Sequence, residues 1–241
     1  MNPWLTPDWP APANVRACVT TRAGGVSAPP FDNFNLGDHV GDEPAAVAEN
    51  RRRLTAELGC QPAWLSQVHG IDVAEADPSA VATADASWSG TRGIACTIMT
   101  ADCLPALFCD RAGTRVGAAH AGWRGLAGGV LEATVDALGV APAELLVWLG
   151  PSIGPQAFEV GPEVREAFLK VHAEAERAFL PIANAGKYMA DIYELARVRL
   201  AAKGVTAVYG GDFCTFTDTE RFYSYRRNAC TGRLASLVWL A

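Results

Sequence analysis

Residues 94–125, IACTIMTADCLPALFCDRAGTRVGAAHAGWRG, decide the fold class of this chain. They contain three short apolar runs, IACTIMT, LPALFC and RVGAAH, and each run is soon followed by Asp or Gly. Two similar runs, WLSQVH and IDVAEA, precede them. Apolar runs of this length, bounded by turn-forming residues, are typical of β-strands. The middle of the chain is therefore predicted to be rich in β-sheet.

Helical patterns surround this sheet-rich middle. Residues 43–58 are predicted to form a helix, with Asp42 as its N-cap and Gly59 just beyond its end. Its Arg51-Arg52-Arg53 run is expected to be a solvated face, in which Glu49 pairs with the last arginine one turn later. Further helices are expected at 122–138, 162–176 and 189–203, and further strands at 15–21, 145–149, 205–209 and 234–240, the last two as a pair.

The composition narrows the class of protein. The chain has 241 residues, with 26 acidic and 20 basic side chains and a net charge of -6. Non-specific binding of nucleic acid depends on clustered Lys and Arg, so a nucleic-acid partner is not expected. No apolar stretch approaches the roughly 18 residues of a membrane span, and the first residues lack the pattern of a signal peptide. We expect a cytoplasmic protein with no membrane partner; the oligomeric state has no signature in the sequence.

The segments form one unit in this interpretation. The sequence contains no repeat, no low-complexity tract and no long linker, so residues 1–241 are predicted to form a single α/β domain. Between the last two strands lies a polar, aromatic stretch, residues 211–233, which is too long for a simple turn. Long loops of this kind often serve a binding or catalytic site.

Three strand ends carry side chains that can bind a metal. His69 ends WLSQVH, Cys103 lies between IACTIMT and LPALFC, and His120 ends RVGAAH, at spacings of 34 and 17 residues. Such spacings are too long for the paired ligands of a zinc finger, but they suit ligands brought together by separate strands. Two imidazoles and one thiolate match the preference of zinc, and three protein ligands leave a position for water. These residues therefore predict a catalytic zinc site that activates water.

Two other interpretations of the same residues remain open. In one, His69 is a hydrogen-bonded histidine at a strand end, Cys103 is a core thiol and His120 is a partner of Asp102. In the other, Cys103 is a thiolate nucleophile, His120 is its base, and Asp102 or another acid orients the imidazole. The seven cysteines are an odd number spread along the chain, and they are expected to be free thiols.

Basic and aromatic side chains lie near these strand ends in the sequence. Arg22 and Arg124 are the nearest basic residues, and a guanidinium group suits the binding of phosphate or carboxylate. Candidates for the walls of a pocket that holds a flat heterocycle are Trp123, Phe158 and Phe213.

At these residues the sequence resembles the YfiH-like, or laccase-domain, family. Members are called polyphenol oxidases, purine nucleoside phosphorylases and peptidoglycan editing factors. The resemblance covers nearly the whole chain and is carried by TTRAGGVS, NFNLGDHVGD, ENRRRL, WLSQVHG, MTADCLPALFCD, AAHAGWRGL, WLGPSIGPQAFEVG, DIYELARVRL and FYSYRRNACTGRLASLVWL. It implies an α/β layered sandwich of mixed β-sheets flanked by helices, and a metal triad at His69, Cys103 and His120.

The resemblance implies several activities, and the histidine count separates them. A multi-copper laccase needs many histidine ligands, whereas this chain has four histidines in all. The resemblance therefore favours zinc-dependent phosphorolysis of adenosine, inosine and 5′-methylthioadenosine, with phosphate as co-substrate and adenosine deamination as a companion reaction. The alternatives are a hydrolase that edits a peptidoglycan precursor, with Cys103 or zinc-activated water as nucleophile, and a copper polyphenol oxidase. A protein that senses nucleotides through a structural zinc is a non-catalytic alternative.

The phosphorylase interpretation assigns roles to particular residues. Arg22, together with Arg124, is expected to hold phosphate, and Asn35 and Gln67 are the amides expected to bind the sugar or the base. Zinc-activated water is expected to attack C6 of adenine in the deamination. Copper is a possible occupant of the triad, because nitrogen and sulfur ligands bind it more tightly than zinc.

Overall fold

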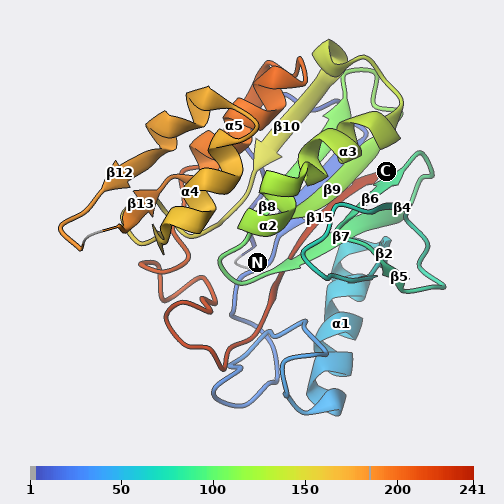
Figure 1. Cartoon of the computed structure of the whole chain (residues 1–241). Helices are drawn as coiled ribbons and strands as arrows, with labels where there is room; N and C mark the ends of the chain where they lie inside the picture. The colour runs from blue at the N-terminus through green and yellow to red at the C-terminus, as the bar shows by residue number, and fades with distance from the viewer. Residues whose placement is uncertain (1–3, 185) are drawn as a thin grey trace.

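The protein is built around two stacked β-sheets with helices on both outer faces (Figure 1). The computed structural model describes residues 4–184 and 186–241. The larger sheet has the order β14-β10-β8-β9-β6-β4, made of Ala207–Gly210, Leu145–Leu149, Leu104–Asp110, Val116–Ala121, Ala86–Ser89 and Val73–Glu75. The smaller sheet has the order β1-β15-β7-β2, made of Val15–Val19, Leu234–Leu240, Ile94–Thr100 and Gln61–Ala63. Both sheets mix parallel and antiparallel pairs.

Shorter elements complete the chain. A three-stranded sheet has the order β11-β13-β12, made of Glu159–Val160, Tyr188–Ala190 and Phe179–Pro181, and a two-stranded sheet joins β3 (Leu65–Ser66) to β5 (Ala82–Thr83). The α-helices are α1 (Pro44–Leu58), α2 (Trp123–Gly128), α3 (Val130–Leu138), α4 (Pro162–Leu169) and α5 (Ile192–Ala202), and the 3₁₀ helices are η1 (Pro142–Glu144) and η2 (Ala173–Ala178). No helix in the described ranges has the length and apolar character needed to cross a bilayer.

The central strands are apolar on both faces because both faces are covered. In β8, Leu104, Ala106 and Phe108 face the layer of helices, whereas Leu107 and Cys109 face the smaller sheet. Successive side chains of a strand point to opposite sides, so a strand buried on both sides shows no alternation of polar and apolar residues. This explains why the LPALFC run has apolar residues at every position.

The helices cover the sheets unequally. Helices α2 to α5 lie over the larger sheet, with α3 against β9, while α1 lies over the outer face of the smaller sheet (Figure 1). Leu54 of α1 packs in one cluster with Leu237 and Trp239 of β15. The result is four layers, helix, sheet, sheet, helix, which confirms the predicted α/β layered sandwich of mixed sheets flanked by helices.

The structure departs from the predicted elements at several places. Asp42 does not cap α1: the N-cap residue is Glu43, and the Asp42 carboxylate accepts hydrogen bonds from Ser27 Oγ (2.6 Å), Asn35 Nδ2 (2.9 Å) and the N–H of Glu43 (2.8 Å). The helix predicted at 122–138 is two helices, because Gly129 adopts a left-handed conformation (φ 108°) between α2 and α3. The last two strands do not pair: β14 joins β10 in the larger sheet, whereas β15 joins β1 and β7 in the smaller one.

Two other predicted helices are shorter than expected. The arginines of the 51–53 run also differ in their surroundings. The 162–176 segment is α4 followed by η2, and the 189–203 segment begins in β13 before α5 starts after its N-cap Asp191. Glu49 pairs with Arg53 at 2.8 Å, as predicted. Arg51 instead turns inward, with its guanidinium 4.1 Å from the ring centroid of Trp64.

Candidate functional site

The three predicted metal ligands come together at one end of the two sheets. His69 lies in the loop between β3 and β4, Cys103 in the turn between β7 and β8, and His120 near the end of β9. Their ligand atoms all lie within 4.8 Å of one another, and Cys103 Sγ is 3.7 Å from His69 Nε2. Among the described residues, no other group of three or more His, Cys, Asp or Glu side chains gathers in this way. The triad could therefore hold a metal ion.

A buried carboxylate, Asp85, holds two of these ligands in place. Its Oδ1 lies 2.7 Å from His120 Nδ1 and accepts the backbone N–H of His69 at 2.9 Å. Its Oδ2 accepts the N–H groups of Val68 (3.1 Å) and Gly70 (2.6 Å). Since Nδ1 of His120 is engaged by the carboxylate, its Nε2 is left to face the cluster, as in metal sites where a carboxylate orients a histidine ligand.

Sequence reasoning missed Asp85. The residue is fully buried and lies between Ala84 and Ala86, which are also buried. A charged residue inside an apolar strand segment is uncommon unless it is hydrogen-bonded, so Asp85 in TADASW was a signal that could have been used.

Asp102 does not orient His120, contrary to the interpretations that gave it this role. Its carboxylate accepts hydrogen bonds from Thr215 Oγ1 (2.6 Å), Ser224 Oγ (3.0 Å) and the N–H of Arg226 (2.6 Å). Asp102 has a left-handed backbone (φ 85°), as does His69 (φ 61°), and such conformations are uncommon outside glycine. Asp102 therefore fastens the 211–233 stretch to the turn that presents Cys103.

Close packing of the triad depends on Gly122. A Cβ atom built on Gly122 would lie 2.8 Å from His69 Cδ2 and 3.1 Å from Cys103 Sγ. Only a residue without a side chain leaves room for both ligands at this position. The ligands thus fit a metal in three respects: the donor set, the convergence of the atoms and the space kept around them.

The charges of the triad favour the ligand form of Cys103. Burial by itself would raise the pKa of this thiol, but the adjacent His120 and His69 imidazoles outweigh burial and lower it to about 6. Burial would likewise lower the pKa of His120, but Cys103 and Asp85 raise it to about 9. A low thiol pKa supplies the thiolate that metals and electrophiles require.

The triad opens into a cavity of about 500 Å³, a size typical of small-molecule sites. Apart from the triad, the lining residues are His39, Gln67, Met99, Thr100, Ala101, Asp102, Trp123, Arg124, Ile153, Phe158, Tyr225, Arg226 and Arg233. Of the residues singled out from the sequence, Gln67, Asp102, Trp123, Arg124 and Phe158 are in this lining. Arg22, Asn35 and Phe213 are outside it.

The three polar candidates other than Arg124 have their polar atoms engaged within the protein. Gln67 lines the cavity, but its Nε2 donates to Met99 O and its Oε1 accepts Met99 N–H, both at 2.8 Å. Arg22 pairs with Asp32 at 3.1 Å and donates to the carbonyl of Thr219. Binding of substrate by these residues stays a prediction.

Asn35 connects two segments of the chain that border the cavity. Its Oδ1 accepts the N–H of Gly37 (2.9 Å) and the N–H of Arg233 (2.8 Å), and its Nδ2 donates to Asp42 (2.9 Å). The side chain is completely buried. Its role in this structure is to hold the 37–42 loop against the start of β15.

Four titratable lining residues were not predicted from the sequence: His39, Tyr225, Arg226 and Arg233. The last three belong to the 211–233 stretch, whose length had indicated a role in a site. Within the described part of the chain, the guanidinium groups of Arg124, Arg226 and Arg233 have no ion-pair partner. The cavity therefore combines a metal-binding triad with three guanidinium groups that have no direct ion-pair partner.

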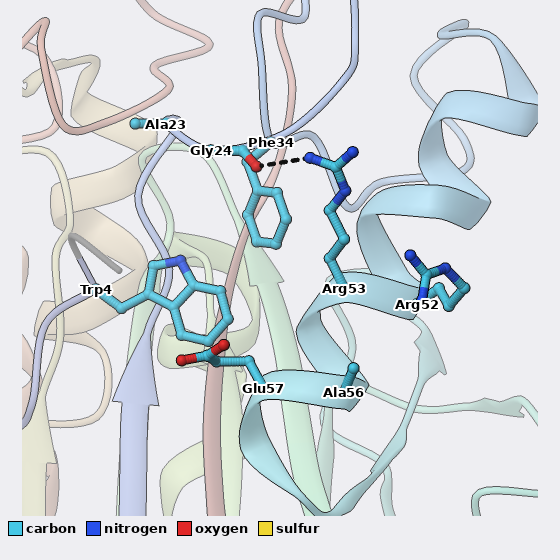
Figure 2. Close-up of a pocket in the computed structure, with 8 residues that line it drawn as sticks. All are labelled: Trp4, Ala23, Gly24, Phe34, Arg52, Arg53, Ala56 and Glu57. Atoms are coloured by element: carbon cyan, nitrogen blue, oxygen red, sulfur yellow. Dashed lines mark hydrogen bonds between the residues drawn. The ribbon is translucent and has the colours of Figure 1, made fainter. Parts of the chain in front are cut away.

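A second hollow, of about 390 Å³, lies beside α1 and shares no lining residue with the triad cavity (Figure 2). Trp4 stacks on Phe34 with 5.6 Å between ring centroids, and Arg53 donates to the carbonyl of Gly24 at 3.3 Å (Figure 2). Both of its arginines, Arg52 and Arg53, pair with Glu49. Because these charges are already paired, the hollow lacks the chemical groups that the triad cavity offers.

Comparison with known proteins gives consistent matches over the whole chain. The family model described as multi-copper polyphenol oxidoreductase laccase matches residues 16–241. A Pseudomonas aeruginosa protein named purine nucleoside phosphorylase is 75% identical over 100% of this chain and 99% of its own length. The Escherichia coli purine nucleoside phosphorylase YfiH is 57% identical, and the aligned region covers 100% of this chain and 100% of that protein. The crystal structure of a Neisseria meningitidis protein superposes with a TM-score of 0.96 at 52% identity, covering 98% of each chain.

We predict that Asp85→Asn lowers the affinity of the triad for Zn²⁺ by about 10- to 100-fold, because the carboxylate that orients His120 and the His69 loop is lost. Competition with a chromophoric chelator measures this affinity. Asp110→Asn is the matched control, since Asp110 is also buried and accepts the N–H groups of Thr114 and Arg115 but is remote from the triad. Equal zinc affinity of the two variants would contradict the role given to Asp85.

We also predict that Gly122→Ala weakens zinc binding by about tenfold or more, because the new methyl group displaces His69 and Cys103. Gly70→Ala is the control: its Cβ would meet Asp85 Oδ2 at 3.4 Å, an ordinary contact. Zinc titration of both variants, with circular dichroism to verify folding, makes the comparison. Unchanged affinity in Gly122→Ala would show that the triad tolerates the added atom.

Proposed function

The chain belongs to the multi-copper polyphenol oxidoreductase laccase family, which includes the YfiH proteins, and from this we propose that it is a zinc-dependent purine nucleoside phosphorylase. Adenosine, inosine and 5′-methylthioadenosine are the proposed substrates, and hydrolytic deamination of adenosine is the proposed companion reaction. The observation that carries the proposal is a cavity of nucleoside size in which a metal-binding triad shares its walls with three unpaired guanidinium groups.

The donor set supports zinc as the proposed metal. His69, Cys103 and His120 supply two nitrogen ligands and one sulfur ligand, which suit this borderline-soft ion and leave it a position for substrate or water. Copper binds such ligands more tightly, so the metal bound in the cell also depends on supply. When bound, the metal would supply a Lewis acid that polarises substrate atoms and activates water at neutral pH.

The arginines of the cavity support phosphate as co-substrate. Arg233 donates from Nη1 to the carbonyls of Thr231 (3.0 Å) and Gly232 (3.2 Å), which fixes the guanidinium and leaves its Nε and Nη2 for a ligand. Burial lowers the pKa of Arg233, and a partly desolvated charge interacts more strongly with an anion. The one carboxylate in the lining, Asp102, is occupied by three donors. We assign phosphate to Arg233, with Arg226 and Arg124 as further donors.

Aromatic side chains around the same cavity suit a purine. Phe158 is buried beside the guanidinium of Arg226, and Trp123 carries the guanidinium of Arg124 at 4.5 Å from its ring centroid. Tyr225 is 56% exposed, which is unusual for a large aromatic residue in a folded protein and suits a platform for a flat ligand. In this proposal the base lies against these aromatic rings, and the neighbouring guanidinium groups hold phosphate next to the ribose.

A second candidate function, hydrolysis of an amide in a peptidoglycan precursor, is favoured by one observation. Cys103 has a lowered pKa and lies next to two imidazoles, which is the arrangement of an activated thiolate nucleophile. A metal in the triad would engage these same lone pairs. Phosphorolysis consumes phosphate and yields ribose 1-phosphate, whereas amide hydrolysis requires no phosphate, so phosphate dependence separates the two functions.

We predict phosphate-dependent release of hypoxanthine and ribose 1-phosphate from inosine, and a loss of about 100-fold or more in this rate with Cys103→Ala, because a metal ligand is removed. Cys230→Ala is the matched control, since this cysteine is exposed. Liquid chromatography of both products, with elemental analysis of the bound metal, makes the measurement. Full turnover by a protein without metal would contradict the proposal, as would a rate independent of phosphate.

We further predict that Arg233→Met raises the KM for phosphate by about tenfold or more and changes the KM for inosine much less, because a hydrogen bond to a charged group contributes about 1.5–3 kcal/mol. Arg16→Met, at an exposed position on β1, is the control. Initial rates over a matrix of phosphate and inosine concentrations give both constants. An equal rise in both would indicate a general disturbance of the cavity rather than loss of a phosphate contact.

A further inference from the structure

The triad and the arginines leave one chemical requirement of nucleoside phosphorolysis unassigned. When the C1′–N9 bond breaks, the electron pair remains on the purine, and the base leaves far more readily when a proton reaches one of its nitrogens. Arginine is too weak an acid to supply that proton. A further side chain that carries a proton and faces the base would meet this requirement.

The lining of the cavity offers few groups for this task. The lone pairs of His69, Cys103 and His120 are committed when a metal is bound. The carboxylate of Asp102 accepts three hydrogen bonds, from Thr215, Ser224 and the Arg226 N–H, and so acts as an acceptor only. Among the described lining residues, the remaining proton carriers are His39 and Tyr225. An imidazolium is a far stronger acid than a phenol, and histidine is the most common general acid in enzymes.

His39 is presented to the cavity by a loop that is firmly held. Asp38 Oδ1 lies 3.5 Å from His39 Nδ1, and Asp38 Oδ2 pairs with Arg51 at 3.2 Å. Arg51 also donates from Nε to the carbonyl of Leu36 (3.0 Å) and stacks on Trp64. These contacts of Arg51 with Trp64, Leu36 and Asp38 hold the loop at the residue before His39, whose own side chain is exposed.

The same loop is fixed relative to the proposed phosphate site. Asn35 Oδ1 accepts both the N–H of Gly37, two residues before His39, and the N–H of Arg233. A buried amide thus sets the position of the histidine loop against that of the arginine that we assign to phosphate. Such a link suits a reaction in which phosphate attacks one side of the ribose carbon while the base departs from the other.

We propose that His39 is the general acid that protonates the departing purine, an inference that rests on the proposed phosphorylase function. An oxygen of HPO₄²⁻ forms a bond to C1′ as the C1′–N9 bond breaks. The imidazolium of His39 gives its proton to the purine, which leaves as the neutral base. The proton released when the phosphate ester reaches its dianionic form returns to His39 through solvent, so nucleoside and HPO₄²⁻ become purine and ribose 1-phosphate dianion with no net change in protons.

A substrate that needs no protonation tests this role. In 7-methylinosine the methylated N7 already carries the positive charge that a proton would supply, so its base can leave without an acid. We expect His39→Asn and His39→Gln to lower kcat for inosine by about 100-fold or more and kcat for 7-methylinosine by less than about tenfold. His172→Asn, a histidine outside the cavity lining, is the matched control and should resemble the unmodified protein on both nucleosides.

The outcomes separate this inference from the function on which it rests. If the unmodified protein releases ribose 1-phosphate from neither nucleoside, the phosphorylase function is wrong and the inference fails with it. If the unmodified protein uses both nucleosides, and the His39 variants lose the two activities equally or lose neither, the inference alone is overturned. Selective loss on inosine in Tyr225→Phe, with the His39 variants unaffected, would also overturn it by assigning the proton to the phenol.

Discussion

The hydrogen bonds of Asp85 are the constraint on which the site depends. Two of the three ligand-bearing segments have no strand ladder that could position the ligand, because His69 lies in a loop and Cys103 in a turn. The carboxylate of Asp85 accepts three consecutive N–H groups of the His69 loop and engages His120 on β9, so one side chain relates the loop to the sheet. A charge can be buried at such a place only because hydrogen bonds replace its water.

Two other side chains around the cavity hold loops by hydrogen bonds in the same way. Asp102 gathers three donors from the 211–233 stretch, and Asn35 joins the 37–42 loop to the first residue before β15. In each case a short polar side chain outside the strands forms hydrogen bonds that substitute for regular backbone pairing. The sheets are rigid, and hydrogen bonds from these three side chains fix the neighbouring loops relative to them.

How much could be predicted from the sequence follows from the range of each interaction. The strand at 234–240 and the helix ending before Gly59 were predicted because apolar runs and terminal residues are local patterns. The metal triad came from residue type, spacing and family resemblance together. Asp85, Arg226 and Arg233 were missed because their importance lies in contacts between distant segments, and nothing nearby in the sequence distinguishes Arg233 from Arg22, which is outside the cavity lining. The separation of β14 from β15 has the same origin, since strand length does not specify a partner.

The position of β15 between β1 and β7 has a consequence for biosynthesis. Strand β1 is translated long before its ladder partner, β15, which consists of residues 234–240. The smaller sheet therefore stays open until these residues have been translated, and its apolar face meanwhile has no stable cover. Pairings over such long separations form slowly, so the nascent polypeptide should be a substrate for chaperones that shield exposed apolar strands.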